Sequence, residues 1–205
     1  MFSAKKIYYE DFAFQVLEDV YEPAEDSFLL AKNLGVRKKD IVLDMGTGCG
    51  ILGILAAKKA METVAIDVNP FAIRCASINA KFNNVKNRFH CIQSDLFLSL
   101  RSEKKFDLVL FNSPYLPVEV TENNSWIERS WAGGITGRKT IDRFISDVSK
   151  YVATHGRVLL LQSNLAGVKK TLCAFQRQQF IAHIIAEKSL PFFETIVLIE
   201  ARKFS

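Results

Sequence analysis

Short apolar runs alternate with longer amphipathic stretches along most of the chain. The apolar runs are typical of buried strands, and they cover residues 41–44, 63–67, 89–93, 106–111 and 157–162. The amphipathic stretches indicate helices, and they cover residues 51–59, 70–82, 139–152 and 167–178. Alternation of this kind predicts an α/β fold whose sheet is mostly parallel.

The last two apolar runs follow a different pattern. Residues 180–186 and 194–203 are separated by little more than the segment 188–191, of sequence Lys-Ser-Leu-Pro. So short a connection favours an antiparallel hairpin over a right-handed crossover. We therefore expect a seven-stranded, mostly parallel sheet with an antiparallel C-terminal strand and helices on both faces. Residues 1–24 and 112–137 fit neither pattern, and the second segment is predicted to be a long functional loop.

The composition is that of an ordinary globular protein. The 205 residues are 49% hydrophobic and 24% charged, so we expect one domain spanning residues 1–205, with residues 1–20 as a short N-terminal extension. No apolar run approaches the roughly 18 residues of a membrane span, and no continuous apolar stretch near the start resembles a signal peptide. These absences favour a cytoplasmic protein.

Cysteines, histidines and charge narrow the chemistry further. The four cysteines form no C-x-x-C pair and there are only three histidines, so we expect reduced thiols and no metal site. The net charge of +5 fits a nucleic-acid partner, but a surface of solvated lysines explains it equally well.

A glycine-rich turn follows the strand predicted at 41–44. It has the sequence Asp44-Met45-Gly46-Thr47-Gly48-Cys49-Gly50, and we call it the first glycine turn. Ligands of open α/β sheets bind at the carboxyl ends of the strands, where glycines allow close approach and the next helix offers free N–H groups. The G-x-G-x-G spacing disfavours a nicotinamide dinucleotide, and the absence of a following Gly-Lys-Ser/Thr excludes a P-loop.

An acidic residue follows each of the first three predicted strands: Asp44, Asp67 and Asp95. A carboxylate at Asp67 can accept both hydroxyls of a ribose, and Asp95 can accept a hydrogen bond from an adenine amino group. Together the acids suit a ligand with a cationic group, a ribose and an adenine, such as S-adenosylmethionine. The alternative is that each aspartate only caps the helix that follows it.

The tetrapeptide Asn112-Ser113-Pro114-Tyr115 follows the strand predicted at 106–111. The Asn112 side-chain oxygen and a backbone carbonyl of the turn can accept the two hydrogens of a planar NH₂ group, and Tyr115 can stack on that group. Pro114 restricts Ser113 to extended conformations. This arrangement suits methylation of an amide or aromatic amine, achieved mainly by positioning. An ordinary Asn-containing turn is the alternative.

These motifs resemble class I methyltransferases that methylate amino groups. Two further segments are similar to the eukaryotic and archaeal branch of the HemK-like methyltransferases: residues 20–27 (Val-Tyr-Glu-Pro-Ala-Glu-Asp-Ser) and 131–138 (Trp-Ala-Gly-Gly-Ile-Thr-Gly-Arg). The resemblance extends from about residue 20 to the end. It implies a single Rossmann-like catalytic domain in which residues 112–137 form a substrate loop.

The resemblance also implies a reaction and a set of partners. Enzymes of this family methylate the side-chain nitrogen of the glutamine in the Gly-Gly-Gln motif of class I translation release factors, using S-adenosylmethionine. Many work with a small zinc-binding activator protein. The family usually has Pro where this chain has Ser113, which removes one conformational lock from the turn. Only about 20 residues precede Tyr21, so we expect release-factor binding to come from the catalytic domain, the activator or both.

The candidate residues follow from the motifs and the resemblance. For the cofactor they are Ser27, Asp44, Gly46, Thr47, Gly48, Gly50, Asp67, Asn69, Asp95, Leu96 and Asn112. For the protein substrate they are Asn112, Ser113, Tyr115 and Trp131, and the catalytic set is Asn112, Pro114 and Tyr115. Arg138 is expected to be a surface charge at a helix start, with pairing to an acidic group of the substrate as the alternative.

Other functions stay open on the sequence alone. The same tetrapeptide could hold the amino group of adenine or guanine in RNA or DNA, although no long basic and aromatic groove is evident. Lysine methylation is a weaker option, because a charged ammonium would need an acid near Asn112. A non-catalytic scaffold that keeps the fold is the alternative from a different class.

Overall fold

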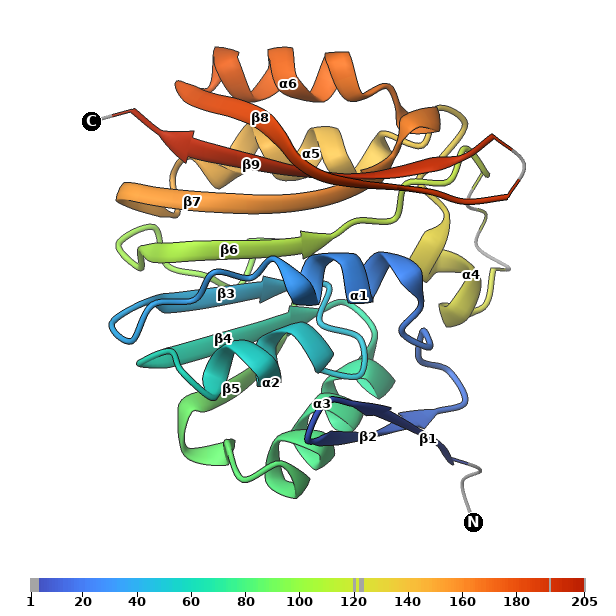
Figure 1. Cartoon of the computed structure of the whole chain (residues 1–205), viewed down its shortest axis with the longest axis vertical. Helices are drawn as coiled ribbons and strands as arrows, with labels where there is room; N and C mark the ends of the chain where they lie inside the picture. Colours follow the sequence, from blue (N-terminus) through green and yellow to red (C-terminus); the bar gives the residue numbers. More distant parts are fainter. Residues whose placement is uncertain (1–3, 120, 122–123, 192, 205) are drawn as a thin grey trace. The chain divides into compact units, whose positions relative to one another are not determined.

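The computed structural model describes residues 4–119, 121, 124–191 and 193–204 (Figure 1). These residues form a mixed α/β fold with a seven-stranded sheet in the order β5-β4-β3-β6-β7-β9-β8 and a separate two-stranded sheet. The predicted fold class is thus confirmed. The chain divides into two compact units, residues 1–100 and 101–205, and each is described by itself. None of the helices in the described part is long and apolar enough to cross a membrane.

The first unit contains three parallel strands and three α-helices. The strands are β3 (Ile41–Met45), β4 (Glu62–Asp67) and β5 (Phe89–Gln93), and their pairing is parallel throughout. The helices are α1 (Glu25–Lys32), α2 (Ile51–Ala57) and α3 (Pro70–Phe82), with a short 3₁₀ helix, η1 (Lys86–Arg88), before β5. The interiors of β3 and β4 are buried and mostly apolar, which explains why the sequence pattern predicted these two strands well.

An N-terminal hairpin lies within residues 1–24, the segment that fits neither sequence pattern. It consists of β1 (Ala4–Tyr9) and β2 (Phe12–Leu17), which pair antiparallel beside α3 (Figure 1). The helix holds it through two carboxamides. The Asn79 amide donates to the Gln15 carbonyl at 2.8 Å and accepts from the Gln15 N–H at 2.8 Å. Asn83 makes the same pair of bonds with Ala13, at 2.8 and 3.2 Å.

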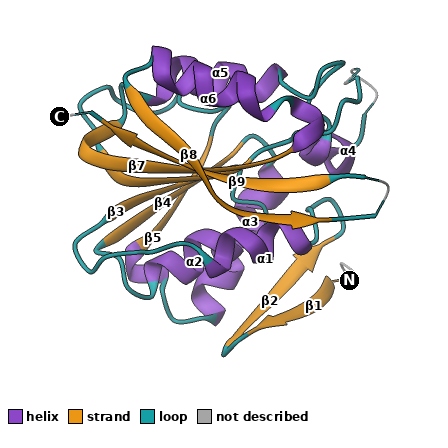
Figure 2. Cartoon of the chain, turned by 45° about the horizontal axis from the view of Figure 1, so that its top comes forward, coloured by secondary structure: helices purple, strands orange, loops and turns teal. Residues whose placement is uncertain are grey.

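The second unit contains the other four strands. They are β6 (Phe106–Asn112), β7 (Val152–Ser163), β8 (Phe180–Ser189) and β9 (Thr195–Lys203). β6 and β7 are parallel, whereas β9 lies antiparallel to both β7 and β8, so the antiparallel C-terminal hairpin is confirmed. The helices α5 (Lys139–Val148) and α6 (Val168–Arg177) lie together on one side of these strands (Figure 2). A 3₁₀ turn, η2 (Asn164–Ala166), connects β7 to α6.

Several details of this unit differ from the sequence prediction. The helix expected to reach residue 152 ends at Val148, and β7 begins at Val152 with an irregularity in its pairing to β6. The segment 112–137, expected to be loop, contains the short helix α4 (Trp126–Trp131). A capping box starts α4, since Ser125 accepts from the Glu128 N–H and the Glu128 side chain accepts from the Ser125 N–H.

Candidate functional site

The buried carboxylate of Asp44 holds the first glycine turn through hydrogen bonds. The side chain is completely buried at the end of β3, and its Oδ2 accepts hydrogen bonds from the Thr47 hydroxyl at 2.6 Å and from the Gly53 N–H at 2.9 Å. A β-carbon at Gly53 would lie 2.7 Å from the same oxygen, so a glycine is required there. One carboxylate oxygen thus joins the turn to the first turn of α2.

The other carboxylate oxygen of Asp44, Oδ1, is available to a ligand. Among the residues that the structure describes, Oδ1 is buried and accepts no hydrogen bond. Burial raises the pKa of Asp44 to about 7, against the lowering effect of the bonds from Thr47 and Gly53. A buried carboxylate with a spare acceptor is costly without a counter-charge. The site therefore suits a ligand that carries a cationic group.

Asp67 connects the turn to the end of β4. Its Oδ2 accepts from the Gly48 N–H and its Oδ1 from the Asn69 N–H, both at 2.9 Å. Burial raises the pKa of Asp67 in spite of these bonds. Each carboxylate oxygen has a second lone pair, and a β-carbon at Gly48 would meet nothing within 4 Å. The backbone of Gly48 is therefore open to a ligand that also bonds the half-buried Asp67.

Asn69, which the sequence offered only as a cofactor candidate, has a structural role in this unit. Its side-chain oxygen accepts from the Phe71 N–H at 2.9 Å, which caps α3. Its amide donates to the Asp19 carbonyl at 2.7 Å. Asn69 thus ties the segment after β2 to the residues that follow β4, and hydrogen bonds join Asp67, Gly48 and Asn69 into one cluster.

The remaining cofactor candidates lie in the same unit with different surroundings. Ser27 is buried in α1, where its N–H and hydroxyl donate to Asp26 at 2.6 and 3.2 Å. Gly46 and Gly50 adopt the left-handed backbone, with φ of 66° and 90°. Asp95 and Leu96 follow β5 and are half-buried, and Leu96 is also left-handed, with φ of 48°.

The tetrapeptide of the second unit begins where β6 ends. Asn112 is the last residue of β6 and pairs with Leu161 of β7. The buried Ser113 makes two bonds to the Leu161 carbonyl, from its hydroxyl at 2.8 Å and from its N–H at 3.3 Å. Proline could make neither bond. Ser113 therefore restrains the turn through hydrogen bonds, whereas the proline expected from the family resemblance would restrain it through its ring.

Residues 131–137 pack directly behind the tetrapeptide. The Leu116 N–H donates to the Trp131 carbonyl at 2.9 Å, and the Gly133 N–H donates to the Leu116 carbonyl at 2.8 Å. A β-carbon at Gly137 would collide with the Tyr115 carbonyl oxygen, so this oxygen lies against the Gly137 backbone. The half-buried Trp131 thus contacts the chain next to Tyr115 through its backbone.

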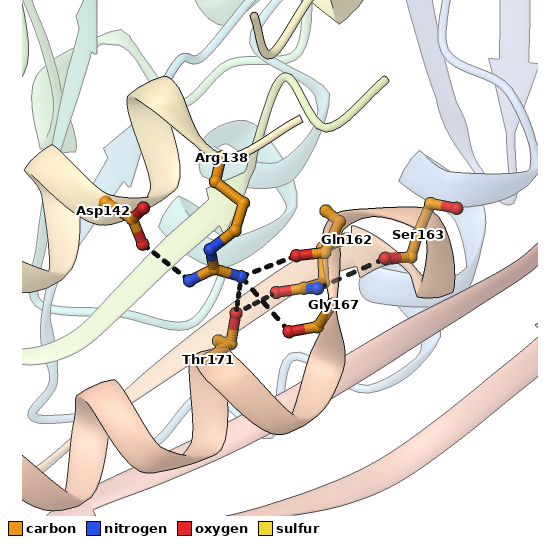
Figure 3. Close-up of polar contacts among 7 residues, drawn as sticks. Arg138, Asp142, Gln162, Ser163, Gly167 and Thr171 are labelled. Carbon is orange, nitrogen blue, oxygen red and sulfur yellow. Dashed lines mark hydrogen bonds and ion pairs between the residues drawn. The ribbon is translucent and has the colours of Figure 1, made fainter. Parts of the chain in front are cut away.

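Arg138 is not the surface charge that the sequence suggested. The residue is 6% exposed, and one guanidinium nitrogen donates to the carbonyls of Ala166 at 2.6 Å and Gly167 at 3.2 Å and to the Thr171 hydroxyl at 2.9 Å (Figure 3). The other nitrogen pairs with Asp142 at 2.6 Å. The alternative, pairing with an acidic group of the substrate, would require the guanidinium to leave these partners within the chain.

Polar residues that the sequence analysis did not single out complete this network. The Thr171 hydroxyl donates to the Gln162 side-chain oxygen at 2.6 Å, and both side chains are fully buried. In the sequence, the one indication of this network was a glutamine at the end of an apolar strand. The other acceptors of Arg138, at Ala166 and Gly167, are backbone carbonyls, which side-chain identity does not reveal.

Comparison with known proteins gives a consistent set of relatives. Residues 22–128 match the family described as methyltransferase small domain. A protein of Methanocaldococcus jannaschii named as a protein N5-glutamine methyltransferase is 44% identical over 183 residues, which cover 88% of this chain and 90% of that protein. Human methyltransferase HEMK2 is 35% identical over 156 residues, covering 70% and 71%.

Among solved structures, the fold matches a chain of the E. cuniculi Mtq2–Trm112 complex. The TM-score is 0.70 at 27% identity, and the match covers 90% of this chain and 99% of that one. That complex is described as responsible for methylating the translation termination factor eRF1.

Proposed function

Because this chain belongs to the HemK-like methyltransferases of the methyltransferase small domain family, we propose that it transfers a methyl group from S-adenosylmethionine to a release-factor glutamine. The acceptor is the side-chain nitrogen of the glutamine in a Gly-Gly-Gln motif. The observation that carries the proposal is the tetrapeptide at the end of β6, fixed by the bonds from Ser113 to the Leu161 carbonyl. It occurs in a chain whose relatives are named for this chemistry.

The residues of the first unit fit S-adenosylmethionine. The spare Oδ1 of Asp44 and its raised pKa suit the α-ammonium group of the cofactor's methionine part, and Asp67 suits the ribose hydroxyls. Asp95 and Leu96 would hold the adenine, and Ser27, Gly46, Thr47, Gly48, Gly50 and Asn69 complete the proposed cofactor set. When bound, the cofactor supplies an electrophilic methyl group.

The tetrapeptide would orient the acceptor. An amide nitrogen is a poor nucleophile because its lone pair is delocalised. The Asn112 side-chain oxygen would accept one N–H of the glutamine and a backbone carbonyl of the turn the other, which directs the nitrogen toward the methyl donor. Tyr115 would pack on the planar amide, and Pro114 would keep the turn rigid. Trp131 would contribute to the substrate surface.

We further propose that the chain works in the cytoplasm with a small zinc-binding activator protein. One chain of the Mtq2–Trm112 complex matches 90% of this chain, and this likeness supports such a heterodimer here. Residues 1–205 would then act as one catalytic domain, with the segment 112–137 contacting the release factor.

The test is transfer of label from radioactive S-adenosylmethionine to a purified class I release factor, with and without the candidate activator. The controls are Asn112→Ala in this chain and Gln→Ala in the Gly-Gly-Gln motif of the substrate. Label that disappears in both controls supports the proposal. If wild-type protein binds the cofactor in calorimetry, yet labels structured RNA instead of the release factor, the glutamine proposal is wrong and a nucleobase amine is the acceptor.

A further inference from the structure

We propose that Arg138 is a positioning residue, which holds the tetrapeptide in its productive geometry by fixing residues 133–137 behind Tyr115. The inference deepens the proposed function and rests on it for the identity of the substrate. Every contact that carries it lies within the second unit.

The first observation is how completely the chain surrounds the guanidinium. Arg138 is 6% exposed, and three of its four hydrogen bonds go to uncharged acceptors: two carbonyls and the Thr171 hydroxyl. Its carboxylate partner, Asp142, has a side chain that is 57% exposed. Burying a charge with so little compensation from an opposite charge is expensive. A role in fixing one segment of the chain against another would account for burying this charge.

The second observation is what the arginine fastens. On one side its acceptors belong to the connection between β7 and α6, at Ala166 and Gly167. On the other side its own backbone directly follows the turn 133–137, which is closed by a bond from the Gly137 N–H to the Gly134 carbonyl at 2.8 Å. Arg138 therefore joins this turn to the connection between β7 and α6.

The third observation connects the turn to the tetrapeptide. The backbone at Gly137 lies so close to the Tyr115 carbonyl oxygen that a β-carbon would collide with it, and the same β-carbon would lie 3.3 Å from Ala166. Gly137 thus lies close both to Tyr115 of the tetrapeptide and to Ala166, whose carbonyl accepts a hydrogen bond from Arg138. If the contacts of Arg138 with Ala166 and Gly167 shifted, Tyr115 would shift too, because the Gly137 backbone contacts it directly.

The Thr171 hydroxyl, which accepts a hydrogen bond from Arg138, is itself held in one orientation. The Thr171 hydroxyl has one hydrogen, which it donates to Gln162 at 2.6 Å, so its lone pairs face Arg138 at 2.9 Å. The Gln162 amide donates to the Ser163 carbonyl at 3.2 Å (Figure 3). Each polar group in this chain of bonds is oriented by the next, as a positioning device requires.

The experiment compares Arg138→Met and Gly137→Ala with two matched controls. Arg143→Met removes an exposed arginine from the same helix. Gly35→Ala places alanine at an exposed position with a φ of 55°, in the same left-handed region as the 69° of Gly137, but outside the contacts that hold Arg138. Four readouts are taken well below the melting temperature: kcat and KM on the release factor, Kd for S-adenosylmethionine, and amide hydrogen exchange of residues 112–118.

We expect Arg138→Met and Gly137→Ala each to lower kcat by about tenfold to a hundredfold, as displacement of a reacting group by about 1 Å would. Their combination should lower it little further, because both act on the same contact. Cofactor Kd should stay within about twofold of wild type, exchange at the Leu116 amide should rise in both variants, and both controls should behave as wild type.

The outcomes separate this inference from the proposed function. Unchanged exchange in Arg138→Met, or faster exchange with unchanged kcat, overturns the positioning role. A kcat loss in Gly35→Ala as large as in Gly137→Ala overturns it too, because backbone strain alone would then be the cause. A wild-type protein that does not label the release factor refutes the substrate, while the exchange measurements still decide whether Arg138 holds the tetrapeptide.

Discussion

Replacing Asp44 with asparagine should stabilise the protein at high pH while weakening its affinity for S-adenosylmethionine. The carboxyl is completely buried, and its pKa is raised from an ordinary 3.8 to about 7. The folded state therefore binds this proton more tightly than the unfolded state does. Stability is lost as the pH rises from about 4 to about 7, and the loss is complete above that range.

The magnitude follows from the shift. A change of one pKa unit corresponds to about 1.4 kcal/mol, so the ionised Asp44 costs about 4 kcal/mol above pH 7 and about 1–2 kcal/mol at pH 5. Asparagine keeps an oxygen for Thr47 and Gly53 but places an unpartnered NH₂ where Oδ1 lies, at a cost of about 1–3 kcal/mol. This cost does not vary with pH. The free energy of unfolding of the variant relative to wild type should therefore rise by about 2–3 kcal/mol between pH 5 and pH 8.

The assay is urea unfolding of wild type and Asp44→Asn at pH 5 and pH 8, together with calorimetric titration of S-adenosylmethionine at pH 8. Asp40→Asn is the matched control, because Asp40 is also buried and lies outside the proposed site. A difference in unfolding free energy that is the same at both pH values would refute the reasoning on the buried charge. Cofactor affinity equal to wild type would refute the assignment of Oδ1 to the cofactor.

Three further predictions concern separate features. Wild-type affinity for S-adenosylmethionine should fall by up to about tenfold per pH unit below pH 7, because protonation removes the charge of Asp44; calorimetry should show no such slope in Asp44→Asn. Ser113→Ala should destabilise the protein by about 1 kcal/mol through the bond lost to Leu161 and should lower kcat with little change in KM, whereas full activity would argue against the lock. Asn79→Ala should cost about 2–4 kcal/mol in denaturant unfolding, because it removes bonds to both backbone groups of Gln15 and to the Cys49 carbonyl; an exposed substitution such as Lys81→Ala on the same helix is its control.

The sequence pattern predicted the elements whose formation depends on local burial. α3 and β5 begin and end where the apolar pattern placed them, and the family resemblance is confirmed by the matched relatives. The N-terminal hairpin escaped prediction because Asn79 and Asn83 hold it from more than 60 residues away. No local pattern encodes so distant a bond.

The residues of the candidate site also fall into those that the sequence could predict and those that it could not. Chemistry-bearing side chains such as Asp67 and Asn112 could be found from their places at strand ends. Arg138 could not be assigned, because its partners are carbonyls and a hydroxyl that only the folded backbone brings within reach. The compensation at Ser113 was also hidden, since its acceptor is the backbone of Leu161 on the neighbouring strand.

The carboxamides of α3 have a consequence for the behaviour of the chain in a crowded solution. A strand with unpaired N–H and C=O groups is a template on which another molecule can add a strand and begin to aggregate. Asn79 and Asn83 occupy those groups at Gln15 and Ala13 of β2. The helix thereby closes this edge without adding a strand, and loss of either asparagine would leave part of it open to another chain.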